Sequence, residues 1–547
     1  MTTKDLLAKG YFSEELPPPF HTVLLAANYP ALQAHFSKLT SKEKEKTKET
    51  SPVLFSTPKI GIYRRITSLP NPIHQIPLAE LVAVNWTALR THWRLSDMSA
   101  SIPIVKRGEK RAIIQISKFQ EFKEKCIKIS YDKRYELKAD VSKYFPSIYT
   151  HSIPWALHTK KVAKLKRFDK TLLGNRLDDA VRAGQSAQTK GIPIGTDTSR
   201  IISEIIGCAL DIELKNKFAA EKIKFTGYRF IDDYQLYFNS LSDAEKALKI
   251  LQKVLGDYSL DLSDEKTCIN TAPYKIDNDW SFLLNGCPLR DTDASIQSHD
   301  LITYINLLIS TSLQFPNDYV IKYGIKRLLK FKIYKANWGL LESLMLKLGI
   351  YEPSVLPSIC AFLLQNKSEV TVERLTQFVH SILDQCIYKG QSFEISWTLW
   401  IAKLFSIKIP LKLAQAIINS RDVISTIILL DIFQLKLIIS RSKLDLSDLI
   451  ADFIEDNLSS ELWLLIYEAT FQKWIKSTAV KSSPFFKELL RLNISFYDVK
   501  ATMISGDPNI RSDIDWDEFF KEIEKGVLGT KRKMKTSRSK KGRVSIY

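Results

Sequence analysis

The chain of 547 residues is 45% hydrophobic and 11% aromatic, which provides enough apolar side chains for two or three packed domains. Its net charge of +19 and pI near 9.3 indicate a polyanionic partner, nucleic acid or nucleotides, unless the surplus consists only of solvated lysines. The six cysteines and eight histidines form no Cys-x-x-Cys, His-x-x-His or His-Glu-x-x-His motif, which excludes a zinc site of these types and fits a reduced cytosolic protein.

Two stretches bear on targeting. Residues Met1–Tyr11 include charged side chains and no apolar signal core. The most apolar stretch, Val423–Ile439, is interrupted by Asp431, Gln434 and Lys436, so we expect a buried helix there and not a membrane span. We therefore expect a cytoplasmic protein without a membrane partner.

Three regions follow one another along the chain. Residues 1–290 mix short β-rich runs with helical segments; within them, Lys42–Glu49 alternates lysine and glutamate, which predicts an exposed helix or a mobile loop. Residues 296–525 are predicted to be nearly all helical. Residues 526–547 contain eight lysines and arginines and no acid, which predicts a disordered tail attracted to phosphates.

Apolar residues recur at three- and four-residue steps in the helical region, and prolines separate segments of helix-hairpin length. The recurring segments are Leu301–Leu313, Leu340–Leu348, Leu375–Leu383 and Leu411–Ile418. The breaks are Pro353, Pro357, Pro410 and Pro484. These features predict a degenerate α-solenoid that resembles HEAT repeats, with an irregular helical bundle as the alternative.

An extended run in the first region ends at Asp140, where the chain is expected to turn toward a helix. The carboxylate would stand at a strand end, unless Asp140 is an ordinary helix N-cap. Further along, Gly191–Thr196 has two glycines flanking a proline, which predicts a rigid loop whose backbone can approach a ligand closely. A helix is expected from Ser199, with one apolar face that includes Ile201, Ile205, Cys208 and Ile212.

The run Phe230–Asp233 places two adjacent carboxylates between apolar flanks. A strand–turn–strand hairpin would hold both acids at its tip, although a solvent-facing turn also favours aspartate. Burying unpaired carboxylates is costly, and divalent metal binding is one good reason to do so. With Asp140, the residues Asp232 and Asp233 can converge on a pair of cations that stabilise both oxygens of an in-line phosphoryl transfer.

Five segments resemble the motifs of reverse transcriptases, and they occur in the order of that family. Motif A is Asp140–Phe145, motif B Gly191–Gly195, motif C Phe230–Asp233 and motif D Leu260–Thr267, and the fifth, the fingers segment, consists of Arg64–Ile66 together with Pro70–Leu78. The resemblance covers about residues 60 to 270. It implies an α+β right-hand polymerase fold with palm and fingers, followed in this chain by the helical-repeat domain.

The resemblance also assigns roles. Asp140 and Asp232 would hold two Mg²⁺ ions, or Mn²⁺, together with the carbonyl of Val141, and Asp233 would complete the acidic cluster. Lys266 would protonate the leaving pyrophosphate, unless it is a solvated lysine.

Further residues would bind the nucleotide. Arg64 and Arg65 would hold the triphosphate, with one of them facing solvent. Phe145 would exclude the ribose 2′-hydroxyl, unless it only packs in the core. Gly195 would let the backbone approach the nucleotide.

Three further segments narrow the subgroup. Tyr149–Trp155, Lys9–Phe12 and Leu16–Phe20 are similar to bacterial defence reverse transcriptases, most closely to the abortive-infection group typified by AbiK. Most reverse transcriptases place glutamine after the proline of motif B, whereas this chain has Ile194, which cannot make those hydrogen bonds to template and primer. Members of the group resemble template-independent DNA polymerases that prime on a tyrosine. Tyr11 is the candidate here, with Tyr29 and Tyr63 as rivals and core packing as the plainer role.

We therefore expect a nucleotidyltransferase that polymerises dNTPs in bacterial antiphage defence, without a template and primed by protein. Its partners would be dNTPs, the single-stranded DNA product joined to the primer residue, and further copies of the chain if the helical domain mediates assembly. One alternative is an RNA-templated reverse transcriptase that uses a noncoding RNA. The other is a catalytically silent nucleic-acid-binding scaffold.

Overall fold

The computed structural model describes residues 1–38, 40, 47–59, 61, 63–275, 279–329, 331–439 and 443–502. All of these residues belong to one compact unit. The basic tail 526–547 lies outside the described residues, and so does most of the lysine- and glutamate-rich stretch Lys42–Glu49.

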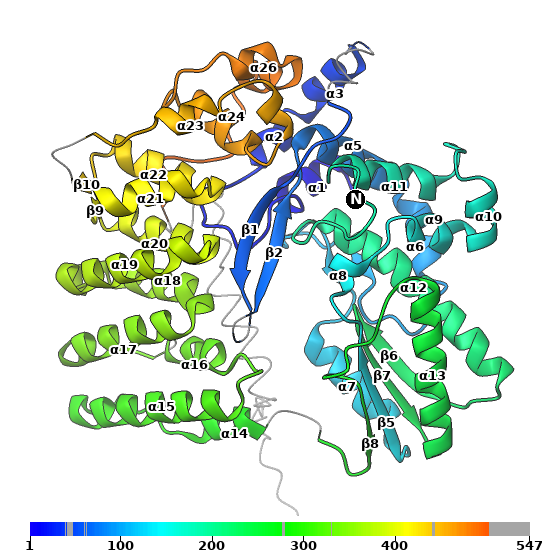
Figure 1. Cartoon of the computed structure of the whole chain (residues 1–547). Coiled ribbons are helices and arrows are strands. Elements are labelled where there is room, and N and C mark those ends of the chain that lie inside the picture. The colour runs from blue at the N-terminus through cyan, green and yellow to red at the C-terminus, as the bar shows by residue number, and fades with distance from the viewer. Residues whose placement is uncertain are drawn as a thin grey trace, which may run out of the picture. The chain divides into compact units, whose positions relative to one another are not determined.

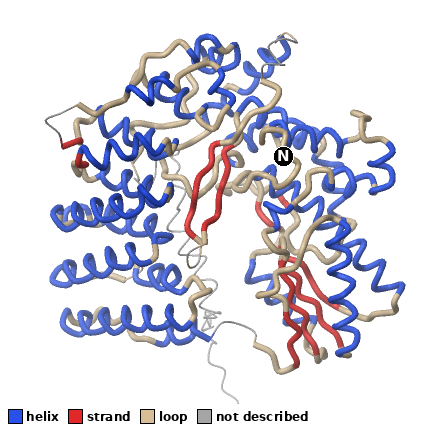
Figure 2. Tube along the Cα trace, in the orientation of Figure 1, coloured by secondary structure: helices blue, strands red, loops and turns tan. Residues whose placement is uncertain are grey.

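An antiparallel sheet of four strands forms the centre of the amino-terminal region, in the order β6-β7-β5-β8 (Figures 1 and 2). The strands are β5 (Tyr135–Asp140), β6 (Thr226–Phe230), β7 (Asp233–Phe238) and β8 (Cys268–Thr271). Residues 98–101 run beside β6, because the amide of Ala100 donates to the carbonyl of Arg229 and the amide of Arg229 to that of Met98, each at 2.8 Å.

Helices cover both faces of this sheet. Alternate residues of a strand point to opposite faces, and the apolar residues of β7 divide accordingly. Tyr234, Leu236 and Phe238 join the main core, to which α12 (Asp197–Ala220) and α13 (Leu241–Asp257) contribute. Tyr237 lies on the other face, in a small apolar cluster with Phe122 of α7 (Phe119–Ile129).

Shorter helices and two hairpins surround the sheet in the rest of this region. The other helices that the structure describes here are α1 (Thr3–Lys9), α2 (Val23–Ala27), α3 (Tyr29–Lys38), α5 (Pro72–Val84), α6 (Trp86–Trp93), α8 (Tyr144–Ser147), α9 (Ser152–His158), α10 (Lys160–Leu165) and α11 (Leu173–Ala183). The hairpins are antiparallel and pair β1 (Val53–Pro58) with β2 (Arg64–Leu69), and β3 (Pro103–Ile104) with β4 (Ile114–Gln115).

The carboxyl-terminal region is helical, as predicted, and Figure 1 shows its helices stacked in successive layers from α14 to α22. Its α-helices are α14 (Asp279–Gly286), α15 (Ala294–Gln314), α16 (Val320–Leu328), α17 (Trp338–Tyr351), α18 (Leu356–Gln365), α19 (Val372–Cys386), α20 (Ser392–Leu404), α21 (Leu411–Ser420), α22 (Val423–Gln434), α23 (Ser447–Ala451), α24 (Trp463–Phe471), α25 (Ala479–Ser482) and α26 (Pro484–Arg491). Two-residue strands β9 (Ile409–Pro410) and β10 (Ile438–Ile439) pair in parallel.

Each of the four periodic segments predicted in this region lies within a helix, namely α15, α17, α19 and α21. The apolar stretch from Val423 forms the buried helix α22, which ends at Gln434. None of the helices in the described ranges is both long and apolar enough to cross a membrane. The HEAT-like nature of the stack stays a prediction.

The two regions share one continuous core. Phe55 of β1 packs against Phe393 of α20, with ring centroids 6.3 Å apart. The indole nitrogen of Trp397 donates to the carbonyl of Glu15 at 2.9 Å, and the side-chain amide of Asn71 donates to the carbonyl of Leu458 at 2.8 Å. The division into domains at residues 290 and 296 stays a prediction, while these contacts join its two sides tightly.

Candidate active site

The adjacent carboxylates lie at the tip of a hairpin, as the sequence predicts. In the ladder between β6 and β7, Phe230 pairs with Asp233, so Ile231 and Asp232 form the two-residue turn. Ile231 has φ 59°, in the left-handed region that a β-branched residue rarely adopts. The turn is therefore held in place by its surroundings and not by the preference of its own residues.

The third carboxylate stands beside this turn. Asp140 is the last residue of β5, as predicted, and its register partner on β7 is Asp233. The amide of Val141 donates to the carbonyl of Asp232 at 3.2 Å, which joins the end of β5 to the turn. Leu137 and Ala139 of β5 belong to the main core, so Asp140 points to the opposite face of the sheet.

Burial and crowding act together on these carboxylates. Burial, followed by the charge of Asp140, raises the pKa of Asp232 to about 6. Burial, the charge of Asp232 and a hydrogen bond with Asp140 raise the pKa of Asp233 to about 7. Like charges directly opposite each other in a ladder destabilise a sheet, so the fold concentrates negative charge here at a cost in stability.

Two cations lie near the carboxylates. Lys266 donates to an oxygen of Asp140 at 2.7 Å, and this hydrogen bond and charge raise the lysine pKa although burial opposes the shift. The charges of Lys266 and Arg65 both lower the pKa of Asp232 against the effect of burial. The structure thus brings Lys266 and Arg65 to the acidic site, and their roles in catalysis and nucleotide binding stay predictions.

The donor set fits a hard divalent cation by its chemistry. Mg²⁺ prefers oxygen ligands, and the carboxylates of Asp140, Asp232 and Asp233 lie at one strand end and turn, with Lys266 in direct contact with Asp140. Within the described ranges, no three acidic, histidine or cysteine side chains stand close enough together to form a coordination group.

The glycine loop lies against motif A. The amide of Ile192 donates to the carbonyl of Phe145 at 3.0 Å, and the amide of Ser68 donates to the carbonyl of Ile194 at 2.8 Å. Gly195 has φ 112°, and a Cβ there would stand 2.9 Å from the Cβ of Ser13. The loop therefore needs glycine at 195 for close packing against the amino-terminal segment, which the sequence interpretation did not foresee.

Phe145 lines a small pocket beside the turn together with Ile231. Gln115 of β4 and Arg200 of α12 line the same pocket. No motif in the sequence marks these two residues, because they reach the pocket from segments outside the five matched motifs. The role of Phe145 as a gate against ribonucleotides stays a prediction.

The structure corrects the assignment of Arg64. Its guanidinium forms an ion pair with Glu394 of α20, and it also donates to the side chain and the carbonyl of Ser56, at 2.9 and 3.0 Å. These bonds take up the donors that would hold a triphosphate. Arg65 is the exposed member of the pair, because neighbouring residues of a strand point to opposite faces.

The structure also removes Tyr11 from consideration as an accessible nucleophile. Its side chain has no exposed surface, its hydroxyl donates to the carbonyl of Pro70, and burial raises its pKa well above the usual value. Of its rivals, Tyr29 donates to Glu80 at 2.5 Å with a pKa raised to about 12, mainly by burial. Tyr63 is 66% exposed.

One residue of the helical region lies near the same cations. Burial raises the pKa of Tyr319, and the charges of Arg65 and Lys266 lower it. Tyr319, which directly precedes α16, is therefore within electrostatic range of Arg65 and Lys266. The sequence gives no signal of this, because the approach depends on how the helical region packs.

Comparison with known proteins shows a match to one protein family. The family model described as "Reverse transcriptase (RNA-dependent DNA polymerase)" matches residues 83–293. No curated protein matches the chain.

Solved telomerase structures are among its structural neighbours. Apo telomerase from Candida tropicalis without its C-terminal domain is 11% identical, with a TM-score of 0.30, over 46% of this chain and 57% of that one. Telomerase from Candida albicans with a fragment of telomeric RNA is 12% identical, with a TM-score of 0.28, over 73% of this chain and 66% of that one. This chain thus spans little more than half of the first neighbour. On the family match, residues 83–293 form a reverse transcriptase domain, which contains Asp140, Asp232 and Asp233.

Proposed function

We propose that this protein is a DNA polymerase of the reverse transcriptase type, which joins dNTPs at Asp140, Asp232 and Asp233. The observation that supports this most directly is the register that sets Asp140 opposite Asp233, next to Asp232 at a turn, inside the matched domain. The accumulated negative charge destabilises the fold without a counter-ion, and binding of divalent cations would offset that cost.

We propose that Mg²⁺ is the cofactor, held by Asp140, Asp232 and Asp233 and by the carbonyl of Val141. Such a cation, when bound, stabilises negative charge on the attacking and leaving oxygens of the transferred phosphate. Lys266, already protonated beside Asp140, can hold a proton near the leaving pyrophosphate.

Three residues would orient the nucleotide. Arg65 supplies the exposed guanidinium, Phe145 lies beside the sugar and the backbone at Gly195 approaches the nucleotide. The pocket shared with Ile231 supports the role of Phe145, the electrostatic effect on Asp232 supports that of Arg65, and the match to motif B supports that of Gly195.

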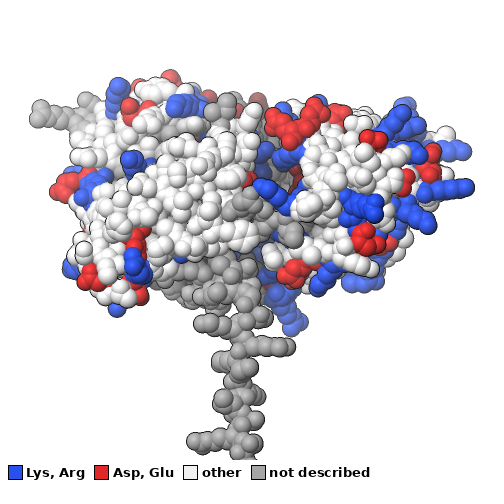
Figure 3. Space-filling view, turned by 90° about the horizontal axis from the view of Figure 1, so that it is seen from below, with Lys and Arg blue, Asp and Glu red and all other residues white. Residues whose placement is uncertain are grey.

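The exposed basic segment after α9 supports a nucleic-acid partner. Lysines and arginines at positions 160, 161, 164, 166, 167 and 170 are exposed, and Phe168 is 76% exposed with the guanidinium of Arg167 at 4.5 Å from its ring centroid. Cations with an exposed aromatic ring suit single-stranded nucleic acid. Seen from below, the side of the molecule that holds the palm carries lysine and arginine along its outer edge (Figure 3).

We further propose that synthesis is independent of a template and primed by protein, in bacterial antiphage defence. The apolar Ile194 in motif B supports the first part, because it offers no side-chain hydrogen bond to a template or primer. With Tyr11 buried, Tyr63 is the exposed candidate among the tyrosines considered. The helical stack is proposed to be a HEAT-like solenoid that binds product or further copies of the chain.

A second candidate is an RNA-templated reverse transcriptase, favoured by the RNA-dependent description of the matched family. One experiment separates the candidates. Purified protein is incubated with Mg²⁺ and labelled dNTPs, with and without RNA and after nuclease treatment, and run on a denaturing protein gel. Label that stays on the protein without RNA supports the proposal, whereas a strict need for RNA favours the second candidate.

Two variants complete this experiment. If Asp232→Ala incorporates as much dNTP as the wild type, this site does not catalyse the reaction, and the domain would then be a nucleic-acid-binding scaffold. Loss of protein-linked label in Tyr63→Phe, with free synthesis on an added primer retained, would identify the priming residue.

A further inference from the structure

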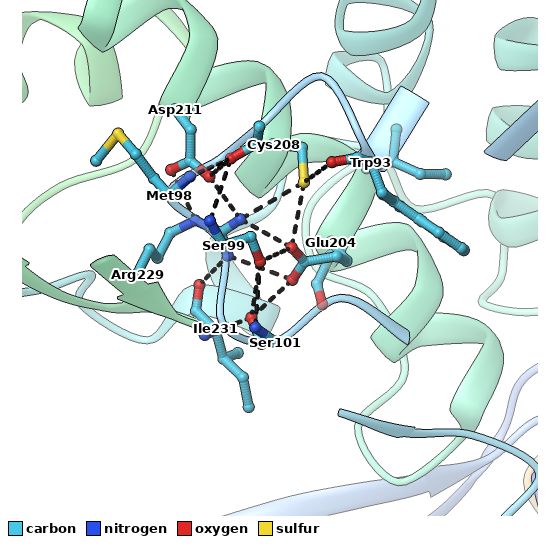
Figure 4. A network of polar contacts seen from close by, with 12 residues as sticks. Trp93, Met98, Ser99, Ser101, Glu204, Cys208, Asp211, Arg229 and Ile231 are labelled. Carbon is cyan, nitrogen blue, oxygen red and sulfur yellow. Dashed lines mark hydrogen bonds and ion pairs between the residues drawn. The ribbon is translucent and has the colours of Figure 1, made fainter. Parts of the chain in front are cut away.

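A buried arginine lies directly beneath the motif C turn. The side chain of Arg229, in β6, is 1% exposed and is surrounded by polar groups from α12 and from residues 96–101 (Figure 4). It donates to Asp211 at 2.8 and 2.9 Å, and to Glu204 at 2.8 and 3.3 Å. Its fifth hydrogen bond, at 2.8 Å, goes to the carbonyl of Ile231 in the turn.

Helix α12 is shaped to receive this arginine. Glu204 and Asp211 lie two turns apart and both reach the guanidinium, while Gly207 stands between them. A Cβ at Gly207 would approach the guanidinium carbon to 2.6 Å, so only glycine leaves room. A buried guanidinium without its acids would be very unfavourable, and this arrangement satisfies all of its donors.

The same network holds the other side of Ile231. The amide of Ile231 donates to the hydroxyl of Ser101 at 2.9 Å, and that hydroxyl donates to Glu204 at 2.9 Å. Both backbone groups of Ile231 are therefore bound by one network, through Arg229 and Ser101. This explains how a β-branched residue stays at φ 59°, a strained conformation that persists only where the surrounding structure imposes it.

We propose that the network of Arg229, Glu204 and Ser101 is a positioning device for Asp232, which follows Ile231 directly. The inference rests on the proposed function, because it gives the network a task in the same site. Ser101 and Glu204 line the same small pocket as Phe145, and the network acts on Asp232 by fixing the backbone from which that side chain projects. Loss of its hold on Ile231 would let the turn relax and displace the carboxylate.

A matched pair of serines separates positioning from mere stability. Ser101 and Ser96 each donate to one acid of the network, Ser96 to Asp211 at 2.7 Å. Only Ser101 binds Ile231, whereas Ser96 accepts from the amides of Met98 and Ser99. Each variant thus deletes one serine hydroxyl that binds an acid beside Arg229. Ser101→Ala also removes a contact to the turn, whereas Ser96→Ala does not.

The test compares the two variants in dNTP incorporation, in thermal melting and in Mn²⁺ binding followed by calorimetry on the metal-free full-length protein. Ser101→Ala is expected to lower kcat and to weaken Mn²⁺ binding by about tenfold or more, with KM for dNTP unchanged. Ser96→Ala is expected to change both by less than about threefold at a similar shift of melting temperature. Arg229→Lys, which keeps the charge, is expected to show the defects of Ser101→Ala in greater degree.

Equal effects of the two serine variants on kcat and Mn²⁺ binding would overturn the inference and reduce the network to a structural one. So would unchanged Mn²⁺ binding in Ser101→Ala, or a wild type that binds no Mn²⁺. Absence of dNTP incorporation in the wild type would defeat the proposed function instead, and Mn²⁺ binding by the variants would still decide whether the turn is positioned by Ser101.

Discussion

At the scale of the residue, function and stability oppose each other in the acidic site. Asp140 and Asp233 face each other across a strand pair, and both Asp232 and Asp233 have raised pKa values. Nothing in the packing of the sheet requires this arrangement, because the register would accept neutral residues equally well. Such strain is characteristic of a site selected for its chemistry.

Replacement of Asp233 by asparagine should therefore stabilise the fold while it abolishes activity. We expect the free energy of unfolding in EDTA to rise by about 1 kcal/mol, since one of two facing charges is removed. Incorporation of dNTPs should fall at least about a hundredfold, because a proposed metal ligand is removed. Chemical denaturation and a primer-extension assay measure the two effects; a variant that is both less stable and fully active would contradict the interpretation.

A second buried acid predicts a pH dependence of stability. Glu468 in α24 accepts hydrogen bonds from the amide of Phe496 and the hydroxyl of Ser495, yet burial raises its pKa to about 7. The unfolded state releases the proton near pH 4.5 and the folded state only near 7. The stabilisation is therefore complete below pH 4.5 and is lost as the pH rises to about 7.

Glu468→Gln should remove this contribution to the pH dependence. The amide mimics the protonated acid, so we expect the variant to be more stable than the wild type at about pH 8 by up to about 3 kcal/mol, and equal to it at about pH 4.5. Urea unfolding at both pH values measures the difference. A variant that is less stable at the higher pH would show that the carboxylate form is the one the fold requires.

At the scale of the element, the segment around α10 (Lys160–Leu165) combines charge with exposed apolar surface. Lys161, Lys164 and Arg167 make no ion pair with any acid in the described part of the chain, and Leu165 is 77% exposed. The helix is short. Its exposed leucine is not packed in the core, and these three cations form no such ion pair, so neither contributes to the stability of the fold. The sequence of this segment therefore points to binding and not to packing.

Charge reversal in this segment should weaken nucleic-acid binding. For Lys161→Glu, Lys164→Glu and Arg167→Glu combined, we expect the affinity for single-stranded DNA to fall and the salt slope to drop by about 0.7 for each phosphate that is no longer neutralised. Fluorescence anisotropy over a salt series measures both. The matched control reverses Lys246, Lys249 and Lys253 on α13, which are all exposed as well; equal effects in both variants would mean that only net charge matters.

At the scale of the whole molecule, one ion pair joins the hairpin of β1 and β2 to the helical region. Glu394 is 1% exposed and is bound by Arg64, while the charge of the adjacent Arg65 lowers the pKa of Asp232. The two neighbouring arginines therefore have different surroundings. The helical region is part of the same core as the four-stranded sheet, and it constrains the hairpin that carries Arg65.

The two arginines should respond differently to replacement by methionine. Arg64→Met leaves a buried carboxylate unpaired and should lower the free energy of unfolding by about 3 kcal/mol. Arg65→Met should leave stability within about 0.5 kcal/mol and raise KM for dNTP about tenfold, because an exposed side chain that we propose as a triphosphate ligand is removed. Denaturation and steady-state kinetics measure these effects, and the reverse pattern would reassign the nucleotide site to Arg64.

The sequence by itself determined the local parts of the site. The strand that ends at Asp140, the hairpin at Asp232 and the helix after the glycine loop follow from short-range patterning of apolar and turn residues. The helices of the carboxyl-terminal region follow from the same periodicity. These features need only neighbours along the chain, which is why they could be predicted.

Only the tertiary structure decided which residues of a similar type serve the site. Arg64 turns to Glu394 and Tyr11 is enclosed by the core, because contacts between segments hundreds or tens of residues apart determine burial and pairing. Arg229, Glu204 and Ser101 meet beneath the turn for the same reason, and no spacing in the chain predicts them. The periodicity of apolar residues along the sequence determines which face of its element a side chain occupies, whereas packing between distant segments determines which residues that side chain contacts.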